Sequence, residues 1–265
     1  MIHKIDKKEF NTVRPLFDQP HLSFVIEAVI AGNSNGDIWV DDPSHPQTVV
    51  LWDKGPRYYL AGRADNQRFN EELNRIVNEI PLGPYLIACC TSTAWDSKLS
   101  GIFAGRLFKK RQRCLYRLNR LQIPNWRDQI LPGFSVARID KELLKDEKLV
   151  NLDDLAGEIR SMWPSVDGFL ENAFGFCMLH NQNEIACWCT AEYVSGSQLG
   201  IGIETVNRYE RQSLATLTAS AFAEHCLSNR LEAHWDSWAD NIPSVRVAEK
   251  VGFGKVLDYY VYQGQ

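Results

Sequence analysis

The stretch from Leu199 to Phe253 most constrains the fold of this chain, because it has the pattern of strand, turn, helix, strand and shorter helix. Ile201 and Ile203 alternate with glycines, which favours a strand whose backbone stays accessible. Nothing between residues 210 and 228 breaks a helix, and apolar residues recur there along one stripe. The pattern predicts a strand that enters a helix through a polar turn.

A second strand is predicted from Glu232 to Trp235, and Asn241 to Ser244 is a good helix start that Gly252 stops. A strand that enters a helix through a turn is a common way to hold a phosphate. The N–H groups of the first helical turn have no internal partner, and the macrodipole adds partial positive charge there. An anion site is therefore expected at the start of the 210–228 helix.

The order of these elements resembles the acetyl-CoA half of the GNAT N-acetyltransferase superfamily. The most specific match is the closing run Asn241-x-x-Ser244-x-x-x-Ala248-x-x-x-Gly252-Phe253. The resemblance implies an α/β GNAT fold with a mixed sheet in the C-terminal half and acetyl-CoA (coenzyme A) as cofactor. In the family the asparagine lies beside the cofactor arm, and the helix that it opens ends at the Gly-Phe pair.

The family also has the pattern (Gln or Arg)-x-x-Gly-x-(Gly or Ala) where the pyrophosphate is gripped, and residues 210–215 match it only at Ala215. Ser213 replaces the glycine but can adopt helical angles, so the amide cradle is expected to survive. Arg208 and Arg211 would restore positive charge, unless they are solvated surface residues. The resemblance gives these cofactor-binding residues: Ile203, Glu204, Thr205, Arg211, Gln212, Ser213, Leu214, Ala215, Asn241 and Ser244.

The resemblance implies that a backbone N–H of residues 203–205 polarises the thioester. For the general base, His234, Glu192 and Asp236 are the catalytic candidates, with Glu204 also considered. A hydrogen-bonded structural role is the alternative for His234. Many relatives carry a tyrosine seven residues after the asparagine as proton donor, and Ala248 stands at that position here. Three explanations are open for this alanine: solvent protonates the leaving thiolate, another residue protonates it, or the protein does not catalyse acetyl transfer.

Two domains are predicted, residues 1–132 and 133–265, with the boundary near Pro132 in a stretch without sustained periodicity. The first half has a predicted hairpin, an amphipathic helix at 66–80, a buried strand, a helix at 95–107 and a further strand. This order approximates that of the second half. We therefore expect the first domain to be a degenerate GNAT-like domain without the cofactor signature.

The composition limits which cellular compartment and which classes of binding partner suit this chain. A net charge of −4 and a pI near 5.9 argue against nucleic acid as a main partner, and no apolar run approaches the roughly 20 residues that cross a membrane. The first ten residues lack the apolar core of a secretory signal, so a cytoplasmic protein is expected. Seven cysteines in no metal-like arrangement indicate buried, reduced thiols and no metal site.

Together these features predict an acetyl-CoA-dependent N-acetyltransferase that acts on the primary amine of a small molecule. The acidic residues Asp236, Asp240 and Glu192 favour a cationic amine acceptor. The closing stretch of the chain is similar to that of the zwittermicin-resistance type, which acetylates a small amine antibiotic. The residues that carry this similarity are Trp235, Asp236, Asn241, Ser244, Gly252 and Phe253. The alternatives are a non-catalytic GNAT-like module that binds a ligand or partner, and an enzyme for a longer acyl or an aminoacyl donor. The oligomeric state stays open.

Overall fold

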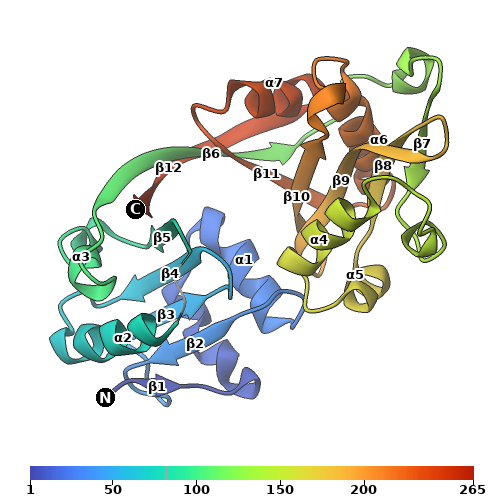
Figure 1. The fold of residues 1–265 in the computed structure, drawn as a ribbon. Coiled ribbons are helices and arrows are strands. Elements are labelled where there is room, and N and C mark those ends of the chain that lie inside the picture. The colour runs from blue at the N-terminus through green and yellow to red at the C-terminus, as the bar shows by residue number, and fades with distance from the viewer. Residues whose placement is uncertain (81–82) are drawn as a thin grey trace. The chain divides into compact units, whose positions relative to one another are not determined.

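The computed structural model describes residues 1–80 and 83–265, and the chain divides into two compact units (Figure 1). The N-terminal unit comprises residues 1–113 and 259–265, and the C-terminal unit comprises residues 114–258. The predicted domain boundary near Pro132 stays a prediction.

The first half of the chain begins with a short strand and two helical segments. Its elements are β1 (His3–Lys4), the 3₁₀ helix η1 (Lys7–Leu16), α1 (Pro20–Ile30), β2 (Asp37–Val40), β3 (Thr48–Trp52), β4 (Arg57–Gly62), α2 (Gln67–Glu79), β5 (Leu86–Cys90), η2 (Thr93–Trp95), α3 (Leu99–Ile102) and β6 (Phe108–Leu118), which enters the C-terminal unit at Cys114. The predicted helix at 95–107 is wrong in extent, because Ala104 and Gly105 adopt positive φ and end the helical segment early.

The second half of the chain repeats this order. Its elements are η3 (Trp126–Gln129), β7 (Phe134–Arg138), η4 (Leu143–Lys145), α4 (Leu152–Met162), α5 (Val166–Asn172), β8 (Gly175–His180), β9 (Glu184–Ser195), β10 (Gln198–Thr205), η5 (Asn207–Tyr209), α6 (Leu214–Ser228), β11 (Glu232–Trp238), α7 (Ile242–Val251) and β12 (Phe253–Gly264), which enters the N-terminal unit at Tyr259. Helix α5 was not predicted, although Ser165 caps it by accepting a hydrogen bond from the Gly168 N–H at 2.9 Å.

Strand pairing makes the repetition explicit. The strand order of the N-terminal unit is β1-β2-β3-β4-β5-β12, and that of the C-terminal unit is β7-β8-β9-β10-β11-β6. In each unit four consecutive strands, β1 to β4 and β7 to β10, pair antiparallel, and the next pair is parallel: β4 with β5, and β10 with β11. The last strand of each order comes from the other half of the sequence, so both units have mixed sheets with the same topology.

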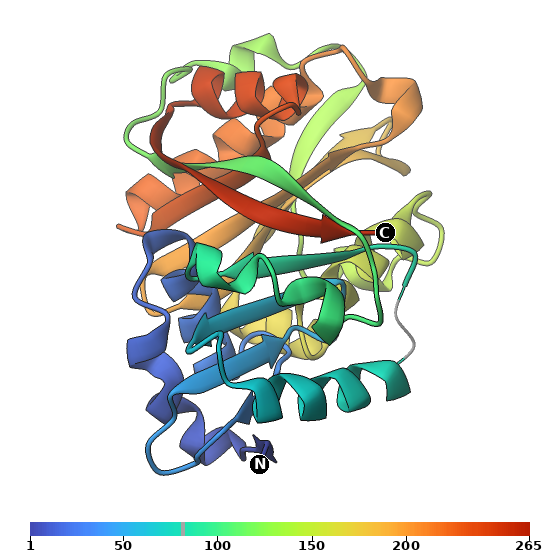
Figure 2. The ribbon, with the colours of Figure 1, turned by 90° about the vertical axis from the view of Figure 1, so that its left-hand side faces the viewer.

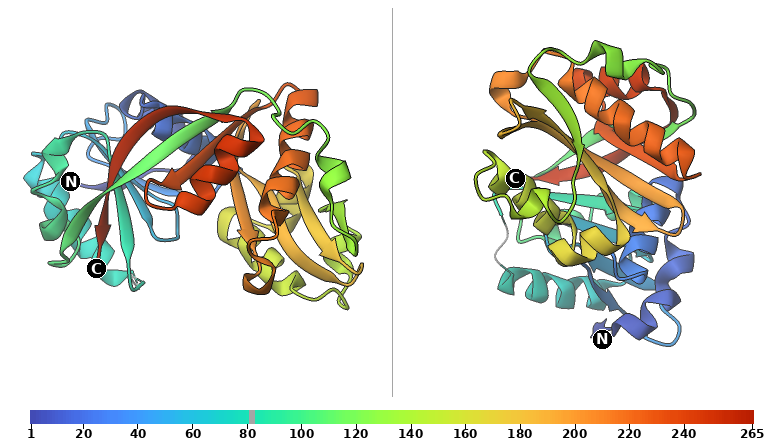
Figure 3. Two further views of the ribbon diagram at one scale, coloured as in Figure 1. Left: turned by 90° about the horizontal axis from the view of Figure 1, so that it is seen from above. Right: turned by 90° about the vertical axis from the view of Figure 1, so that its right-hand side faces the viewer.

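Helices cover these sheets through apolar faces. In the N-terminal unit α2 lies along the strands and buries Phe69, Leu73 and Val77 (Figure 2). In the C-terminal unit α6 packs on one face of β8–β10 and α4 on the other (Figure 3). Neighbouring residues of β8 show the two faces, since Cys177 joins the core under α4 and Met178 the core under α6.

All seven cysteines are free, and six of them are buried, as the sequence predicts. Burial raises the pKa of the Cys187 thiol to about 11 and that of Cys177 and Cys226 to about 12. These side chains therefore pack as neutral thiols at physiological pH. Within residues 1–80 and 83–265, no helix has the length and hydrophobicity required to cross a bilayer.

Candidate active site

The parallel pair β10–β11 is open over half its length. Pairing runs from Gln198, opposite Glu232, to Gly200, opposite His234, and stops there. Both strands continue: β10 to Thr205, paired only with β9, and β11 to Trp238. The edges of two strands are therefore left facing each other without a ladder, which exposes backbone N–H and C=O groups.

Backbone direction decides which predicted amides face this opening. The Val206 N–H donates to the Ala186 carbonyl on β9, while the Ser197 carbonyl accepts from Glu232 on the β11 side. Because backbone groups alternate along a strand, the N–H groups of Ile203 and Thr205 point into the opening. The Glu204 N–H points toward β9 by the same alternation, so only two of the three predicted residues 203–205 present their amides there.

Helix α6 begins with an uncapped first turn. Arg211 and Ser213 have φ of 62° and 64°, and no side chain caps the helix, whose first residue is Leu214. The expectation that Ser213 adopts helical angles is wrong, since it takes the left-handed conformation that a glycine would favour there. The amides of Leu214 and Ala215 are thus left without a side-chain acceptor, in a concave turn suited to an anion.

The two arginines near this turn have different surroundings. Arg208 forms an ion pair with Glu184, whose Oε2 also accepts a 2.6 Å hydrogen bond from the Tyr209 hydroxyl. The same hydroxyl lies 2.9 Å from His180 Nδ1. Arg211 is exposed, and within the described chain it pairs with no carboxylate. Arg211 is therefore the arginine that can supply positive charge at the start of α6.

Three predicted catalytic side chains lie near one point of the sheet. Gly200 pairs with Glu192 on one side and with His234 on the other, so the side chains of Glu192 and His234 project from the same face with no side chain between them. A Cβ at Gly202 would lie 2.0 Å from Glu192 Oε1, so the glycine makes room for that carboxylate. Asp236 follows His234 by two residues and points to the same side.

His234 is a buried imidazole. Only 8% of it is exposed, and its Nε2 lies 3.4 Å from Glu232 Oε1. Burial lowers the pKa of His234, an effect that Glu232 partly opposes and Arg117 reinforces. The ring is consequently neutral at pH 7, the state in which it can accept a proton from an amine.

Asn241 and Ser244 lie at the start of α7. Asn241 Oδ1 accepts the Ser244 N–H at 3.3 Å, so the asparagine is the helix N-cap. The Trp235 indole N–H donates to Ser244 Oγ at 3.0 Å and ties the helix start to β11. Ala248 is fully buried in the core, so the position at which the resemblance implies a tyrosine proton donor carries no hydroxyl here.

Sequence reasoning missed the structural support of the β10–α6 turn. The network of Tyr209, His180 and Glu184 holds the turn against β8 and β9, and no spacing in the sequence connects these residues. The left-handed conformations of Arg211 and Ser213 were also missed, because a glycine would have signalled them and neither residue is one.

The order of strands and helices in the C-terminal unit is that of the GNAT N-acetyltransferase fold. The chain belongs to the GNAT acetyltransferase family, whose model matches residues 14–262. A curated relative, the uncharacterized N-acetyltransferase YdfB of Bacillus subtilis (strain 168), is 23% identical over 268 residues that cover 99% of this chain and 98% of that protein.

Solved structures share the fold across both units. A GCN5-related N-acetyltransferase-like protein from Streptococcus suis has a TM-score of 0.73 at 21% identity, covering 97% of this chain and 99% of that one. A tandem GNAT protein from the clavulanic acid biosynthesis pathway has a TM-score of 0.64 at 11% identity, covering 99% and 97%. The predicted fold class, with a GNAT-like first half, is confirmed.

Proposed function

We propose that this protein transfers the acetyl group of acetyl-CoA to the primary amine of a small molecule. The observation that carries the proposal is the uncapped start of α6 beside the unpaired ends of β10 and β11. The amides of Leu214 and Ala215, with Arg211, would hold the diphosphate. The family's use of acyl-CoA donors supports this assignment.

The chemistry follows from the groups around the opening. The N–H groups of Ile203 and Thr205 would stabilise the oxyanion that forms when the amine attacks the thioester carbonyl. His234 would take the amine proton, with Glu192 as the second candidate base. The leaving thiolate would be protonated by water, because Ala248 carries no hydroxyl.

The class of acceptor amine is proposed from the charge of the side chains near the opening between β10 and β11. Glu192 and Asp236 lie at the opening, and their carboxylates favour a cationic amine over an anionic or neutral acceptor. A small amine of the kind acetylated by the zwittermicin-resistance type fits this charge. The uncapped turn would contact the diphosphate and not the acyl chain, so it does not determine how long an acyl chain the site accepts. The experiment therefore varies the acyl donor as well as the acceptor amine.

A thiol-release assay over a panel of small amines tests the function, with acetyl-CoA and a longer acyl-CoA as donors. Activity is expected with acetyl-CoA and a cationic amine, reduced in Asn241→Ala and in His234→Ala. Thermal shifts with acetyl-CoA and free CoA separate donor binding from catalysis. Binding without thiol release from any amine would favour the non-catalytic module, and full activity in both variants would overturn the site assignment.

A further inference from the structure

Tyr209 is the residue at which the turn between β10 and α6 is anchored to the rest of the C-terminal unit. The structure describes every residue of this turn, 207–213, and among them Tyr209 alone is buried. Its ring belongs to the same apolar core as Leu214 and Leu217, two residues of the first turn of α6. The position of this one side chain is therefore tied to the position of the helix start.

Three separate strands hold the Tyr209 side chain. Phe134 of β7 meets the phenol ring edge to face, with the ring centroids 5.8 Å apart. His180, the last residue of β8, places its Nδ1 atom 2.9 Å from the Tyr209 hydroxyl. Glu184, the first residue of β9, accepts a 2.6 Å hydrogen bond from the same hydroxyl. Because the side chain is held both at its ring and at its oxygen, it has one defined position.

Glu184 is a mostly buried carboxylate with donors on both of its oxygens. Only 12% of its side chain is exposed. Its Oε1 atom pairs with Arg208 and accepts from Asn151 Nδ2 at 3.2 Å, while Oε2 accepts from Tyr209. Three donors, one of them a guanidinium, favour the ionised carboxylate. The proton in the 2.6 Å bond therefore belongs to the Tyr209 hydroxyl.

That single proton sets the direction of the whole hydrogen-bonded chain. Since the phenol uses its proton toward Glu184, its oxygen can only accept a hydrogen bond from His180. His180 Nδ1 must then carry a hydrogen, which leaves Nε2 as an acceptor. The side-chain nitrogen of Asn181 lies 3.3 Å from this Nε2 atom and is the matching donor. The bonds thus run in one direction, from Asn181 through His180 and Tyr209 to Glu184.

We propose that Tyr209 is a positioning residue for the donor site, because its hydroxyl fixes the turn that leaves the amides of Leu214 and Ala215 free. This role rests on the proposed binding of acetyl-CoA at the start of α6. Between Tyr209 and the helix, Arg211 and Ser213 have positive φ, which costs free energy in residues other than glycine. Such a turn persists only where its surroundings fix it, and the anchored tyrosine supplies that constraint on one side.

The structure also separates this role from the chemical step. Without the Tyr209 hydroxyl, the turn should hold its left-handed conformation for only part of the time, and the affinity for the donor should fall with that fraction. The end of β10 is held by other bonds: the Val206 N–H donates to the Ala186 carbonyl at 3.0 Å, and the Thr205 hydroxyl to Cys187 Sγ at 3.3 Å. The amides proposed to polarise the thioester should therefore keep their places.

Tyr209→Phe tests the proposal, because it keeps the buried ring and removes only the hydroxyl. In calorimetry on the full chain, the Kd for acetyl-CoA should rise about tenfold. In the thiol-release assay, the KM for acetyl-CoA should rise by a similar factor, while kcat stays within about threefold of the wild type. Amide hydrogen exchange of residues 210–215 without ligand should be faster than in the wild type.

Tyr262→Phe is the matched control, because the Tyr262 hydroxyl donates to Asp96 in the N-terminal unit and the change removes the same kind of bond. It should leave the Kd for acetyl-CoA within about twofold of the wild type and the exchange of residues 210–215 unchanged. Circular dichroism of both variants confirms that they fold.

The wild-type chain is measured first, which separates this inference from the proposed function. A wild type that binds no acetyl-CoA would overturn both. A wild type that binds acetyl-CoA no more tightly than Tyr209→Phe would overturn the positioning role alone. Equal losses of affinity in Tyr209→Phe and Tyr262→Phe would also overturn it, because the effect would then reflect general stability. Unchanged exchange of residues 210–215 in Tyr209→Phe would contradict the proposed constraint on the turn.

Discussion

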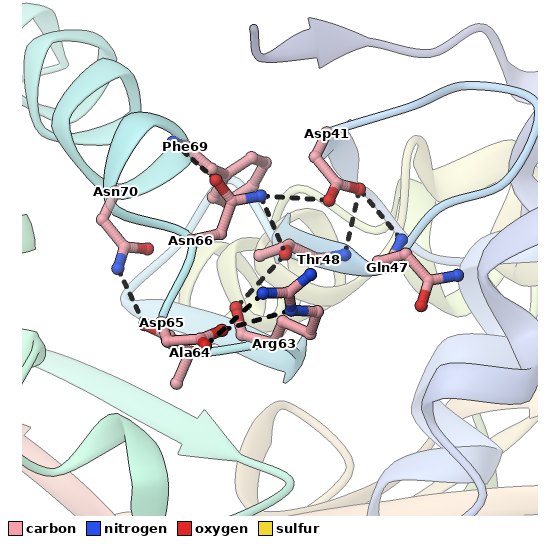
Figure 4. Close-up of polar contacts among 9 residues, drawn as sticks. All are labelled: Asp41, Gln47, Thr48, Arg63, Ala64, Asp65, Asn66, Phe69 and Asn70. Carbon is pink, nitrogen blue, oxygen red and sulfur yellow. Dashed lines mark hydrogen bonds and ion pairs between the residues drawn. The ribbon is translucent and has the colours of Figure 1, made fainter.

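The starts of α2 and α6 occupy the same place in two units of the same topology, yet they are built in opposite ways. Asn66 caps α2 and also bonds to Asp41 and Thr48, at 3.0 and 3.2 Å, so a closed polar network fills the helix start (Figure 4). Ser213 precedes α6 in a left-handed conformation and caps nothing. A few turn residues thus decide which helix start is capped by a side chain and which is not.

The parallel strand pairs show the same contrast. Pairing of β4 with β5 reaches Leu60 and Cys90, the end of β5, and the Thr91 N–H still donates to the Leu60 carbonyl. Pairing of β10 with β11 stops at Gly200 while both strands continue. A closed ladder leaves no backbone donor for a ligand, which is why we assign the proposed thioester chemistry to the C-terminal unit.

The largest expected effects come from one constrained glycine in each unit. Gly62 and Gly252 have φ of 79° and 123°, and a Cβ would lie 2.0 and 1.8 Å from a backbone carbonyl oxygen. Alanine at either position should lower the free energy of unfolding by about 3 kcal/mol. Gly32, at φ of 81° in open space, is the control and should lose about 1 kcal/mol. Equal losses at all three, measured by urea unfolding, would contradict the steric argument.

Making the start of α6 resemble that of α2 should weaken acetyl-CoA binding. Ser213→Asp keeps a residue that tolerates positive φ and adds a carboxylate that competes for the free amides. Its affinity for acetyl-CoA, measured by calorimetry, should fall about 100-fold. The control change Asn66→Ser replaces one good N-cap by another in the N-terminal unit, without placing a second carboxylate beside Asp41, and should leave acetyl-CoA affinity unchanged. Equal effects of the two changes would remove the distinction between the units.

His234→Gln tests the neutral imidazole of the C-terminal unit. Because burial lowers the pKa of His234 below its unfolded value near 6.5, the folded state resists protonation, and stability is lost as the pH falls below about 6.5. The variant should lose less stability between pH 7.5 and 5.5 than the wild type.

As a general base, His234 should also set the acidic limb of the rate profile. His234→Gln is expected to lower kcat/KM roughly 30-fold at pH 7.5, less than a complete loss because Glu192 lies nearby. The profile should also lose the limb that falls below pH 6.5. A variant with wild-type kcat/KM and an unchanged profile would assign His234 a packing role only.

The smallest expected changes in the free energy of unfolding should have opposite signs in the two units. Asn66→Ala removes the cap on the Phe69 N–H and should destabilise the chain by about 1 kcal/mol. Ser213→Gly relieves a left-handed serine and should stabilise it by about 0.5 kcal/mol without weakening acetyl-CoA binding. The two free energies of unfolding, measured side by side, check the comparison. A destabilising Ser213→Gly would indicate an unrecognised role for the hydroxyl.

Much of the fold could be predicted because periodicity is local. The bounds of helices α2 and α7 were predicted to within one residue. The helix predicted from residue 210 begins at Leu214 instead, since the preceding turn is held by side chains from β8 and β9. Local propensity carries no information about such distant partners.

The candidate site, too, could be predicted only in part from the sequence. Asn241 was recognised from its position before a helix with Pro243 and Gly252, and the structure shows the expected cap. The convergence of Glu192 and His234 on Gly200 depends on the register of three strands, which the sequence alone does not fix.

By itself, the sequence determined the family, the element order of the C-terminal half and the helix start at Asn241, because each depends on spacing within a few tens of residues. Only the tertiary structure decided that the β10–β11 ladder ends at Gly200, that Ser213 is left-handed, and that Arg208 is held by Glu184. Those features depend on hydrogen bonds and ion pairs between separate elements, which form only when the chain has folded.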